Sequence, residues 1–200
     1  MIFVIFMART AGTKKAETHE RIVRAAAKAI RRDGYAGTSV ADVMSDAGLT
    51  HGGFYAHFPS REAMLAEGLD HAATEALESL IGSSTVRAAK ENIDPLQALV
   101  ESYLSDRHLA ATETGCTLAA LGSETRRQTP EIRRVATKRL KELATLVEHQ
   151  AAGRDSAPEA LATLATLVGA LLIARIVDDP ELAREVRASA ARLVLGTSQR

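Results

Sequence analysis

Four polar side chains between residues 39 and 61 are of types that contact nucleic acid. Thr50 and His51 carry a hydroxyl and an imidazole, which can form hydrogen bonds with the edges of bases. Ser39 and Arg61 stand at the expected N-termini of two helices, where unpaired backbone N–H groups attract phosphate. We therefore expect a DNA-contacting surface here, with the first pair near bases and the second pair near phosphates.

No catalytic arrangement competes with this interpretation. Paired carboxylates, a nucleophile motif and a phosphate-binding glycine loop do not stand out in the sequence. His71, His108 and His149 do not form a metal-ligand spacing with each other or with Cys116, so neither a metal nor a cofactor is expected. An all-helical enzyme and a helical interaction module without DNA binding stay open as alternatives.

Cys116 is the only cysteine, so an intramolecular disulfide is impossible. This fits a protein of the reducing cytoplasm. A lone cysteine of this kind is more often inert packing than a redox sensor, and no basic residue lies within one helical turn of it.

The spacing around the polar residues predicts a helix-turn-helix. Ser39 can cap the first helix, with Asp42 as its reciprocal partner three residues later. Gly48 can adopt the positive φ of a sharp helix exit, and Thr50 can cap the second helix. In such a motif the second helix enters the major groove of DNA. The apolar face of the first helix follows the i, i+3, i+4, i+7 spacing and consists of Val40, Val43, Met44 and Ala47.

Two adjacent glycines, Gly52 and Gly53, fall inside the expected second helix. Each weakens a helix by about 1 kcal/mol relative to alanine. Close approach of the backbone to DNA would compensate for this cost, so both glycines join the expected DNA contacts. Their small size also shortens the reach of the helix and leaves the reading of bases to fewer side chains.

The charge of the chain is unevenly distributed. Lys and Arg number 25, as do Asp and Glu, yet the first 32 residues contain eight basic side chains against Glu17 and Glu20, a net charge of +6. Positive charge directly before a helix-turn-helix is typical of a phosphate-binding face, although a solvated helix face is the plainer alternative. The eight are Arg9, Lys14, Lys15, Arg21, Arg24, Lys28, Arg31 and Arg32.

Capping residues, glycines and prolines divide the chain into about nine helices and no strands, which predicts an all-α fold. The first helix is expected from about Thr18 to Arg32, and Ser156 to Glu159 forms a capping box for the eighth. The other expected helices are 40–47, 50–57, 60–81, a helix from 95 that ends before Gly115, 116–126, 130–150, 158–177 and 180–195, with 82–93 as a loop or frayed turn.

The apolar run from Met1 to Met7 is much shorter than the roughly 20 residues of a membrane span. An upstream start, with Met7 as the true first residue, is favoured over a cleaved signal or an anchor. We expect no membrane association, because charges interrupt every other long apolar run.

The eighth expected helix, 158–177, is apolar around nearly its whole circumference, so it must be buried on all sides. Together with the helix 180–195 it carries more apolar surface than one subunit can cover. The simplest way to bury this surface is pairing with a second copy through a two-fold four-helix interface. A fully intramolecular core is the alternative. The expected interface residues are Leu164, Val168, Leu171, Leu172, Leu182, Val186 and Leu193.

The ordered residues from Ile22 to Leu65 resemble the TetR family of bacterial transcriptional regulators. Each marker is weak alone, but the set is specific in this order and spacing. Arg61 departs from the lysine that the family usually has there, and Gly53 from threonine, alanine or serine. The markers are Ile22-Val23-x-Ala25-Ala26, Gly34-Tyr35, Thr38-Ser39-Val40, Ala47-Gly48-Leu49-Thr50, Phe54-Tyr55-x-His57-Phe58 and Ser60-Arg61-Glu62, and Gly115-Cys116-Thr117-Leu118 looks like a variant of one broad branch.

The resemblance implies an N-terminal three-helix DNA-binding domain and a C-terminal helical domain for ligand binding and dimerisation. The boundaries expected are a flexible basic arm at 1–17, the DNA-binding domain at 18–65 and the second domain at 66–200. The resemblance also implies a homodimer on double-stranded operator DNA, most often a repressor that a small-molecule effector releases. Helix 60–81 is the expected lever between the two domains.

The resemblance also assigns roles to individual residues. Tyr55 and His57 match phosphate contacts of the family, although a packing histidine is the alternative for His57. The DNA contacts expected are therefore Ser39, Thr50, His51, Gly52, Gly53, Tyr55, His57 and Arg61. The effector cavity is expected to be lined by Leu99, Tyr103, Cys116, Leu118, Leu121, Leu140 and Leu172.

Overall fold

The computed structural model describes residues 2–152 and 159–196, with side chains described from residue 14 onward. The prediction of an all-α fold is confirmed, since this part of the chain forms nine α-helices and one 3₁₀ helix and no strand. The helices are α1 (Ile2–Gly37), α2 (Val40–Asp46), the 3₁₀ helix η1 (His51–Ala56), α3 (Arg61–Glu91), α4 (Pro95–Tyr103), α5 (Asp106–Ala110), α6 (Thr117–Thr125), α7 (Pro130–Ala151), α8 (Ala160–Ile176) and α9 (Pro180–Leu195).

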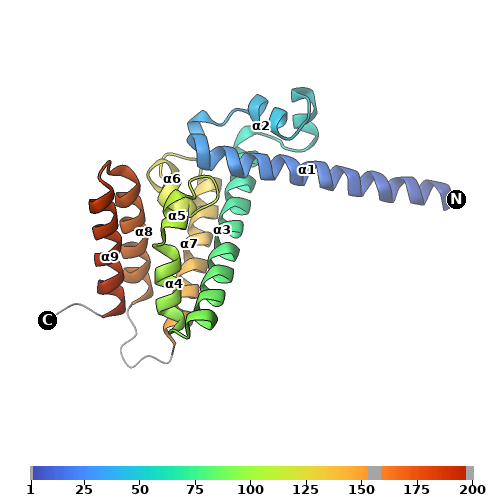
Figure 1. The fold of residues 1–200 in the computed structure, drawn as a ribbon. Coiled ribbons are helices and arrows are strands. Elements are labelled where there is room, and N and C mark those ends of the chain that lie inside the picture. The colour runs from blue at the N-terminus through green and yellow to red at the C-terminus, as the bar shows by residue number, and fades with distance from the viewer. Residues whose placement is uncertain (1, 153–158, 197–200) are drawn as a thin grey trace.

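Helices α3 to α9 form a bundle, and α1 lies across one end of it (Figure 1). The helix α2 sits on the outer side of α1, away from the bundle, and the N-terminal part of α1 extends past the bundle edge (Figure 1). Helices α8 and α9 pack on each other and form the opposite edge of the bundle (Figure 1). The recognition elements and the α8–α9 pair therefore lie at different ends of the subunit.

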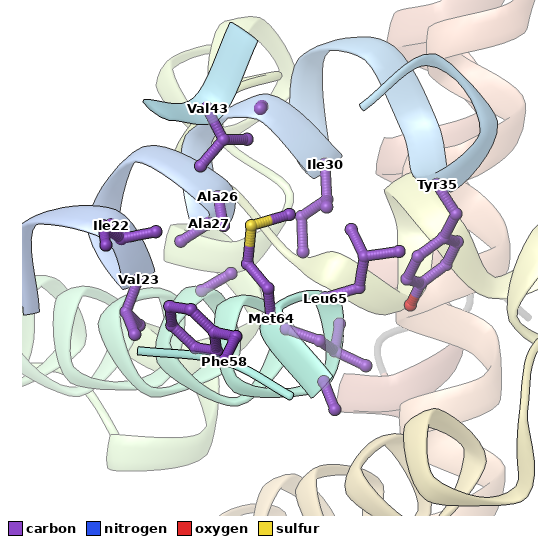
Figure 2. Close-up of a cluster of buried hydrophobic side chains, with 14 of the residues drawn as sticks. Ile22, Val23, Ala26, Ala27, Ile30, Tyr35, Val43, Phe58, Met64 and Leu65 are labelled. Atoms are coloured by element: carbon purple, nitrogen blue, oxygen red, sulfur yellow. The ribbon is translucent and has the colours of Figure 1, made fainter. Parts of the chain in front are cut away.

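Two hydrophobic clusters hold these parts together. The first joins α1, α2, η1 and the start of α3, and it also takes in Leu121 of α6 and Ile132 of α7. Figure 2 shows Ile30 of α1 beside Met64 and Leu65 of α3, and Val23 of α1 beside Phe58. The second cluster occupies the bundle and draws its side chains from α3, α4 and α6 to α9. Leu121 and Ile132 thus tie the DNA-binding end to the bundle through a shared core.

Several expected helix boundaries are wrong. The first helix begins at Ile2 instead of near Thr18, so residues 2–17 continue the same helix. The expected loop at 82–93 is mostly helix, because α3 runs on to Glu91 and ends at Asn92, which has a left-handed φ of 51°. The short helix α5 between α4 and Gly115 was not expected. The predicted capping box from Ser156 falls largely outside the described residues, and Glu159 makes no side-chain capping bond at α8.

The extension of α3 has a tertiary cause. Residues 82–91 contain no proline, and Arg87 forms an ion pair with Glu101 of α4 at 3.0 Å. Packing of this kind stabilises helices beyond what local propensity predicts. Within residues 2–152 and 159–196, no helix combines the length and apolar character that crossing a bilayer requires.

Candidate nucleic-acid interface and inner cavity

The turn between α2 and η1 is built by local contacts. The Ser39 hydroxyl donates to the Asp42 carboxylate at 2.6 Å and accepts from the backbone N–H of Asp42 at 3.1 Å. Gly48 has a φ of 66°, and the N–H of Leu49 donates to the Met44 carbonyl at 2.8 Å, which closes the end of α2. The predicted Ser39 cap, its pairing with Asp42 and the glycine turn are therefore present, although the two residues meet through their side chains and not through the backbone N–H of Ser39.

The recognition segment, residues 50–56, consists of the cap residue Thr50 and the 3₁₀ helix His51–Ala56, where an α-helix was expected. Thr50 occupies its N-cap position but makes no side-chain capping bond, so the predicted cap is wrong and the hydroxyl stays unused. Thr50 and His51 are exposed, and Tyr55 is 74% exposed. Phe54 points inward and is buried, which anchors the segment.

Neither glycine of this segment is required by the packing of the subunit. A Cβ atom built on Gly52 would meet no atom within 4 Å, and one on Gly53 would only touch the Met44 methyl group at 3.7 Å. The backbone of Gly52 therefore faces open space, and that of Gly53 lies in ordinary contact with Met44. An incoming macromolecule could approach the backbone of Gly52 closely.

The guanidinium of Arg61 is engaged within its own subunit although 33% of the side chain is exposed, and its contact with phosphate stays a prediction. Its guanidinium donates to the carbonyl oxygens of Tyr35 and Thr38, with Nε 3.0 Å from the Thr38 oxygen. A guanidinium can hold several acceptors at once, because its donors are fixed in one plane. Arg61 thus joins the start of α3 to the end of α1.

Most described basic side chains of this flank have partners within the protein, but Arg24, Lys28 and Arg32 stay exposed, so the phosphate-binding face stays a prediction. Arg31 is buried and donates to the Ala72 carbonyl at 3.0 Å and to Glu75 at 2.9 Å. Lys28 pairs with Glu113 at 3.3 Å. The side chain of Arg9 lies outside the described residues. Three more are engaged as well: Arg21 donates to the Ala47 carbonyl, Arg24 pairs with Glu20, and Arg32 pairs with Asp33.

Lys14 and Lys15 are the exceptions among the described residues of this flank, since both are exposed and neither side chain has an ion-pair partner there. Lys15 lies close to His57 and to His19 of α1. Burial, and then the positive charges of His19 and Lys15, lower the pKa of His57. The Nδ1 atom of His57 is buried without a partner among the described residues. Both interpretations of His57 therefore stay open, but Lys15 places positive charge beside the recognition segment.

A second set of contacts connects this end to the bundle. The N–H of Tyr35 donates to the Glu124 carboxylate of α6 at 3.1 Å, and the Tyr35 hydroxyl lies 3.2 Å from the Thr125 hydroxyl. Gly34 makes this possible, because it has a φ of 71° and a Cβ there would lie 2.7 Å from a Glu124 oxygen. Burial raises the pKa of Tyr35, so its hydroxyl stays neutral. No local pattern in the sequence indicates this pairing across 89 residues.

The bundle contains an inner cavity of about 40 Å³. The polar side chains on its wall are those of Tyr103, His108, Cys116, Thr117 and Arg139. The rest of the wall is apolar and comes from α3, α6 and α7: Ala73, Ala76, Leu77, Leu80, Leu118 and Leu143. Of the predicted cavity residues, Tyr103, Cys116 and Leu118 lie here.

The other four predicted cavity residues lie elsewhere. Leu99 and Leu121 are core side chains, with Leu121 in the cluster shared with α1. Leu140 borders a separate surface groove between α6, α7 and α8. Leu172 is exposed on α8. These helices have enough apolar residues to fill the core. Their spacing alone therefore could not distinguish the side chains that line the cavity from those that pack in the core.

His108 holds the cavity wall in place. Its Nδ1 atom lies 2.7 Å from the Tyr103 carbonyl, and its Nε2 accepts from the N–H of Cys116 at 3.1 Å. Nδ1 must therefore carry the proton, and the ring is neutral. Burial is the main cause of its lowered pKa. Gly115 allows this close packing, since a Cβ there would lie 2.4 Å from the Ala111 carbonyl oxygen.

Two further charged groups near the cavity were not predicted from the sequence. Arg139 of α7 donates to Asp70 of α3 at 2.8 Å and to Glu142 at 2.7 Å. Burial alone would raise the pKa of Asp70, but the hydrogen bonds and charge of Arg139 bring it below its usual value. Arg175 of α8 donates to the carbonyls of His108, Leu109 and Ala111. Both pairings are long-range, so only the fold reveals them.

The predicted pairing face on α8 and α9 is partly corrected. Leu164 and Leu171 are buried inside their own subunit, so they are not available to a partner. Val168 and Val186 are half-buried against the same core. The free apolar side chains of these two helices are Leu161, Leu172, Ile173, Ile176, Leu182 and Leu193, of which the predicted set included Leu172, Leu182 and Leu193.

Comparisons with known proteins agree with this arrangement. Residues 22–67 match the family model described as bacterial regulatory proteins, tetR family. The HTH-type transcriptional regulator Rv0196 of Mycobacterium tuberculosis is 32% identical over 170 residues, which cover 78% of this chain and 84% of that protein.

Two solved structures share the fold. A TetR transcriptional regulator from Chloroflexus aurantiacus is 25% identical, with a TM-score of 0.71 over 92% of this chain and 96% of that one. AibR, in complex with isovaleryl coenzyme A and operator DNA, is 16% identical, with a TM-score of 0.59 over 88% of this chain and 97% of that one.

Proposed function

Because this chain belongs to the tetR family of bacterial regulatory proteins, whose members regulate transcription and are not enzymes, we propose that it is a repressor released from its operator by a small effector. In this proposal the recognition segments of a homodimer occupy successive major grooves of a pseudo-palindromic site. Effector binding in the bundle changes the spacing of the two segments and weakens DNA binding.

The observation that carries the proposal is the exposed recognition segment. Thr50, His51 and Tyr55 present unused polar groups at the outer end of the subunit. Gly52 leaves the backbone open to close approach. Thr50 and His51 suit base edges, and Tyr55 suits a phosphate oxygen. Lys15 supplies a nearby positive charge, and Ser39 marks the N-terminus of α2 on the same unit.

A homodimer is supported by the apolar side chains that α8 and α9 leave exposed. Leu161, Leu172 and Ile176 recur along α8 with Ala165 and Gly169 between them. A Cβ on Gly169 would meet no atom within 4 Å, so this face of α8 is open inside one subunit. Small residues between large ones permit close helix packing. A second copy would cover this face.

Release by an effector is supported by the position of α6. The start of this helix, at Thr117 and Leu118, lines the inner cavity. Its other end holds Glu124 and Thr125 against Tyr35 of the DNA-binding end. A ligand that shifts α6 would therefore act on Tyr35, and through Arg61 on α3. We propose α6 as the connecting element, in place of α3 alone. A coupling of about 1–3 kcal/mol would weaken DNA binding about 5- to 150-fold.

AibR is a precedent for a protein of this fold that binds both a small molecule and DNA, since its solved complex contains isovaleryl coenzyme A and operator DNA. At 16% identity this likeness concerns the fold, and it does not identify the effector of the present chain.

Selection of bound duplexes from a random DNA pool tests the proposal. We expect an inverted repeat whose half-sites are about 10 base pairs apart from centre to centre. The Thr50→Ala and His51→Ala variants should relax the selected sequence at one position in each half-site. Recovery of no common sequence, with no retention of DNA at low salt, would reject it.

A further inference from the structure

The inner cavity adjoins a second, wider hollow that also has charged residues on its wall. This outer groove has a volume of about 520 Å³ and runs between α3 and the α4–α5 segment. Both hollows are bordered by Ala76, Leu80 and His108, so they meet along one wall. Only this shared wall separates the small interior cavity from the wider groove at the surface.

One buried polar group in the inner cavity lacks a nitrogen or oxygen partner. The Tyr103 side chain is 2% exposed, and its hydroxyl has no nitrogen or oxygen partner among the described residues; the polar group beside it is the Cys116 thiol. Two of the other polar side chains on the wall are committed, since both ring nitrogens of His108 and the guanidinium of Arg139 are engaged as described above. An unsatisfied buried hydroxyl is costly, so an oxygen atom of a ligand would satisfy it.

The outer groove is positively charged. Its wall contains Arg87, Lys90 and Arg107 against the single carboxylate of Glu91. Arg87 is held by Glu101 at 3.0 Å and by Glu91 at 4.0 Å. Lys90 and Arg107 are exposed, and no acidic side chain of the described residues lies within ion-pair distance of either. Two cations are therefore free to bind an anion in this groove.

We propose that the two hollows form one site for an organic anion that carries a short acyl group. The acyl chain lies in the inner cavity, its carbonyl oxygen accepts a hydrogen bond from Tyr103, and the anionic head lies between Lys90 and Arg107. An inner volume of about 40 Å³ admits about three non-hydrogen atoms, which makes the buried part short. The outer groove has the size of ordinary ligand sites.

This site rests on the proposed function in one respect, namely that its occupant is the effector. Binding itself can be measured without DNA. Titration calorimetry of the full chain with N-acylglycines is suitable, because these probes combine an acyl chain, a carbonyl and a carboxylate. The series consists of N-acetylglycine, N-butyrylglycine and N-hexanoylglycine, and the methyl ester of each is the matched neutral probe.

We expect at least one of these acids to bind more tightly than its ester. In Tyr103→Phe the affinity for acid and ester alike should fall about three- to tenfold, as expected for the loss of one hydrogen bond. In the double variant Lys90→Ala/Arg107→Ala the affinity for the acid should fall by a similar factor while that for the ester is unchanged. The control Lys141→Ala, an exposed cation of α7 that borders neither hollow, should match the wild type.

Folding does not confound this test, because Tyr103→Phe keeps the ring and removes only a hydroxyl without a nitrogen or oxygen partner. Its melting temperature without ligand should be no lower than that of the wild type. Failure of the whole series to bind at millimolar concentration would overturn the proposal, and so would equal affinity for acid and ester. Binding that leaves the affinity for DNA unchanged would support the site and reject the effector role alone.

Discussion

The Glu124 carboxylate of α6 accepts a hydrogen bond from the backbone N–H of Tyr35 at 3.1 Å, across 89 residues of sequence. Tyr35 lies where α1 ends, and its carbonyl in turn accepts from Arg61 at the start of α3. Three helices that belong to two functional regions therefore meet at one residue. Gly34, with its positive φ, leaves the space that this meeting requires.

The Glu124→Ala variant should loosen this junction. The buried N–H of Tyr35 would lose its acceptor, which costs about 1–3 kcal/mol of stability. Amide hydrogen exchange should become faster at residues 35–38 and stay unchanged in α8 and α9. The control is Glu148→Ala on the exposed surface of α7, which should leave the exchange pattern intact. Equal protection of the amides of residues 35–38 in both variants would show that Glu124 does not stabilise this junction.

Arg61 should affect stability more than DNA affinity. The Arg61→Gln variant removes the charge and cannot hold the carbonyls of Tyr35 and Thr38 together, so it should lose about 1–3 kcal/mol. Chemical denaturation gives this value directly. The salt dependence of DNA binding should be the same as in the wild type. A normal stability with a shallower salt dependence would show Arg61 to be a phosphate contact.

The Ile176→Glu variant should separate the subunits. Ile176 is 72% exposed in one subunit, so the charge does not disturb the monomer. In a dimer formed through α8 and α9, the introduced carboxylate would be a buried unpaired charge, which costs about 3–5 kcal/mol. The dissociation constant of the dimer should therefore rise at least about 100-fold. Sedimentation velocity reports the change.

The control for this measurement is Val86→Glu, which places the same charge on an exposed apolar residue of α3, away from α8 and α9. It should sediment as the wild type does. If Ile176→Glu also keeps the wild-type sedimentation coefficient across all concentrations, the pairing surface lies elsewhere.

Acid should destabilise the protein through His108. The pKa of this residue is lowered from its ordinary value of 6.5, chiefly by burial, and the neighbouring charge of Arg175 acts in the same direction. The unfolded chain therefore takes up a proton before the folded protein does, as pH falls. The stability that the neutral His108 ring contributes to the folded protein is fully present above about pH 6.5. It is lost as pH falls from there through the pKa of His108 in the folded protein.

Denaturation midpoints measured from about pH 8 to about pH 5 test this effect. In His108→Gln, which keeps a neutral donor and acceptor, the decline towards acid should be smaller. His57 has a lowered pKa too, so some decline should remain. An identical pH profile in both proteins would show that His108 does not titrate as proposed.

The parts of the site that the sequence predicted correctly depend on neighbouring residues. The Ser39 cap with its Asp42 partner and the Gly48 turn are three- to five-residue patterns whose geometry is fixed locally. The family resemblance indicated Tyr55, which is exposed next to the buried Phe54, and its contact with DNA stays a prediction.

The parts that the sequence did not reveal depend on distant residues. The partners of Arg61 and Arg31 lie 23 to 44 residues away from them in sequence. Leu164 and Leu171 were expected at a dimer interface, because an all-apolar helix does not indicate which side faces its own core. Charge and periodicity show which side chains a helix carries on each face. Whether such a side chain meets solvent, its own core or a partner subunit depends on the helices that pack against it.

Fluorescence anisotropy of the selected operator duplex over a range of salt concentrations tests the central claim most directly. We expect two subunits per operator and a steep linear fall of log affinity with log salt. Tyr55→Phe should weaken binding about tenfold or more without loss of stability. Lys15→Ala should reduce the salt slope by about 0.9 for each phosphate that is no longer neutralised, hence by about 1.8 for a dimer. No binding at low salt, or unchanged affinity and slope in both variants, would contradict the claim that the recognition segment and Lys15 form the DNA-binding surface.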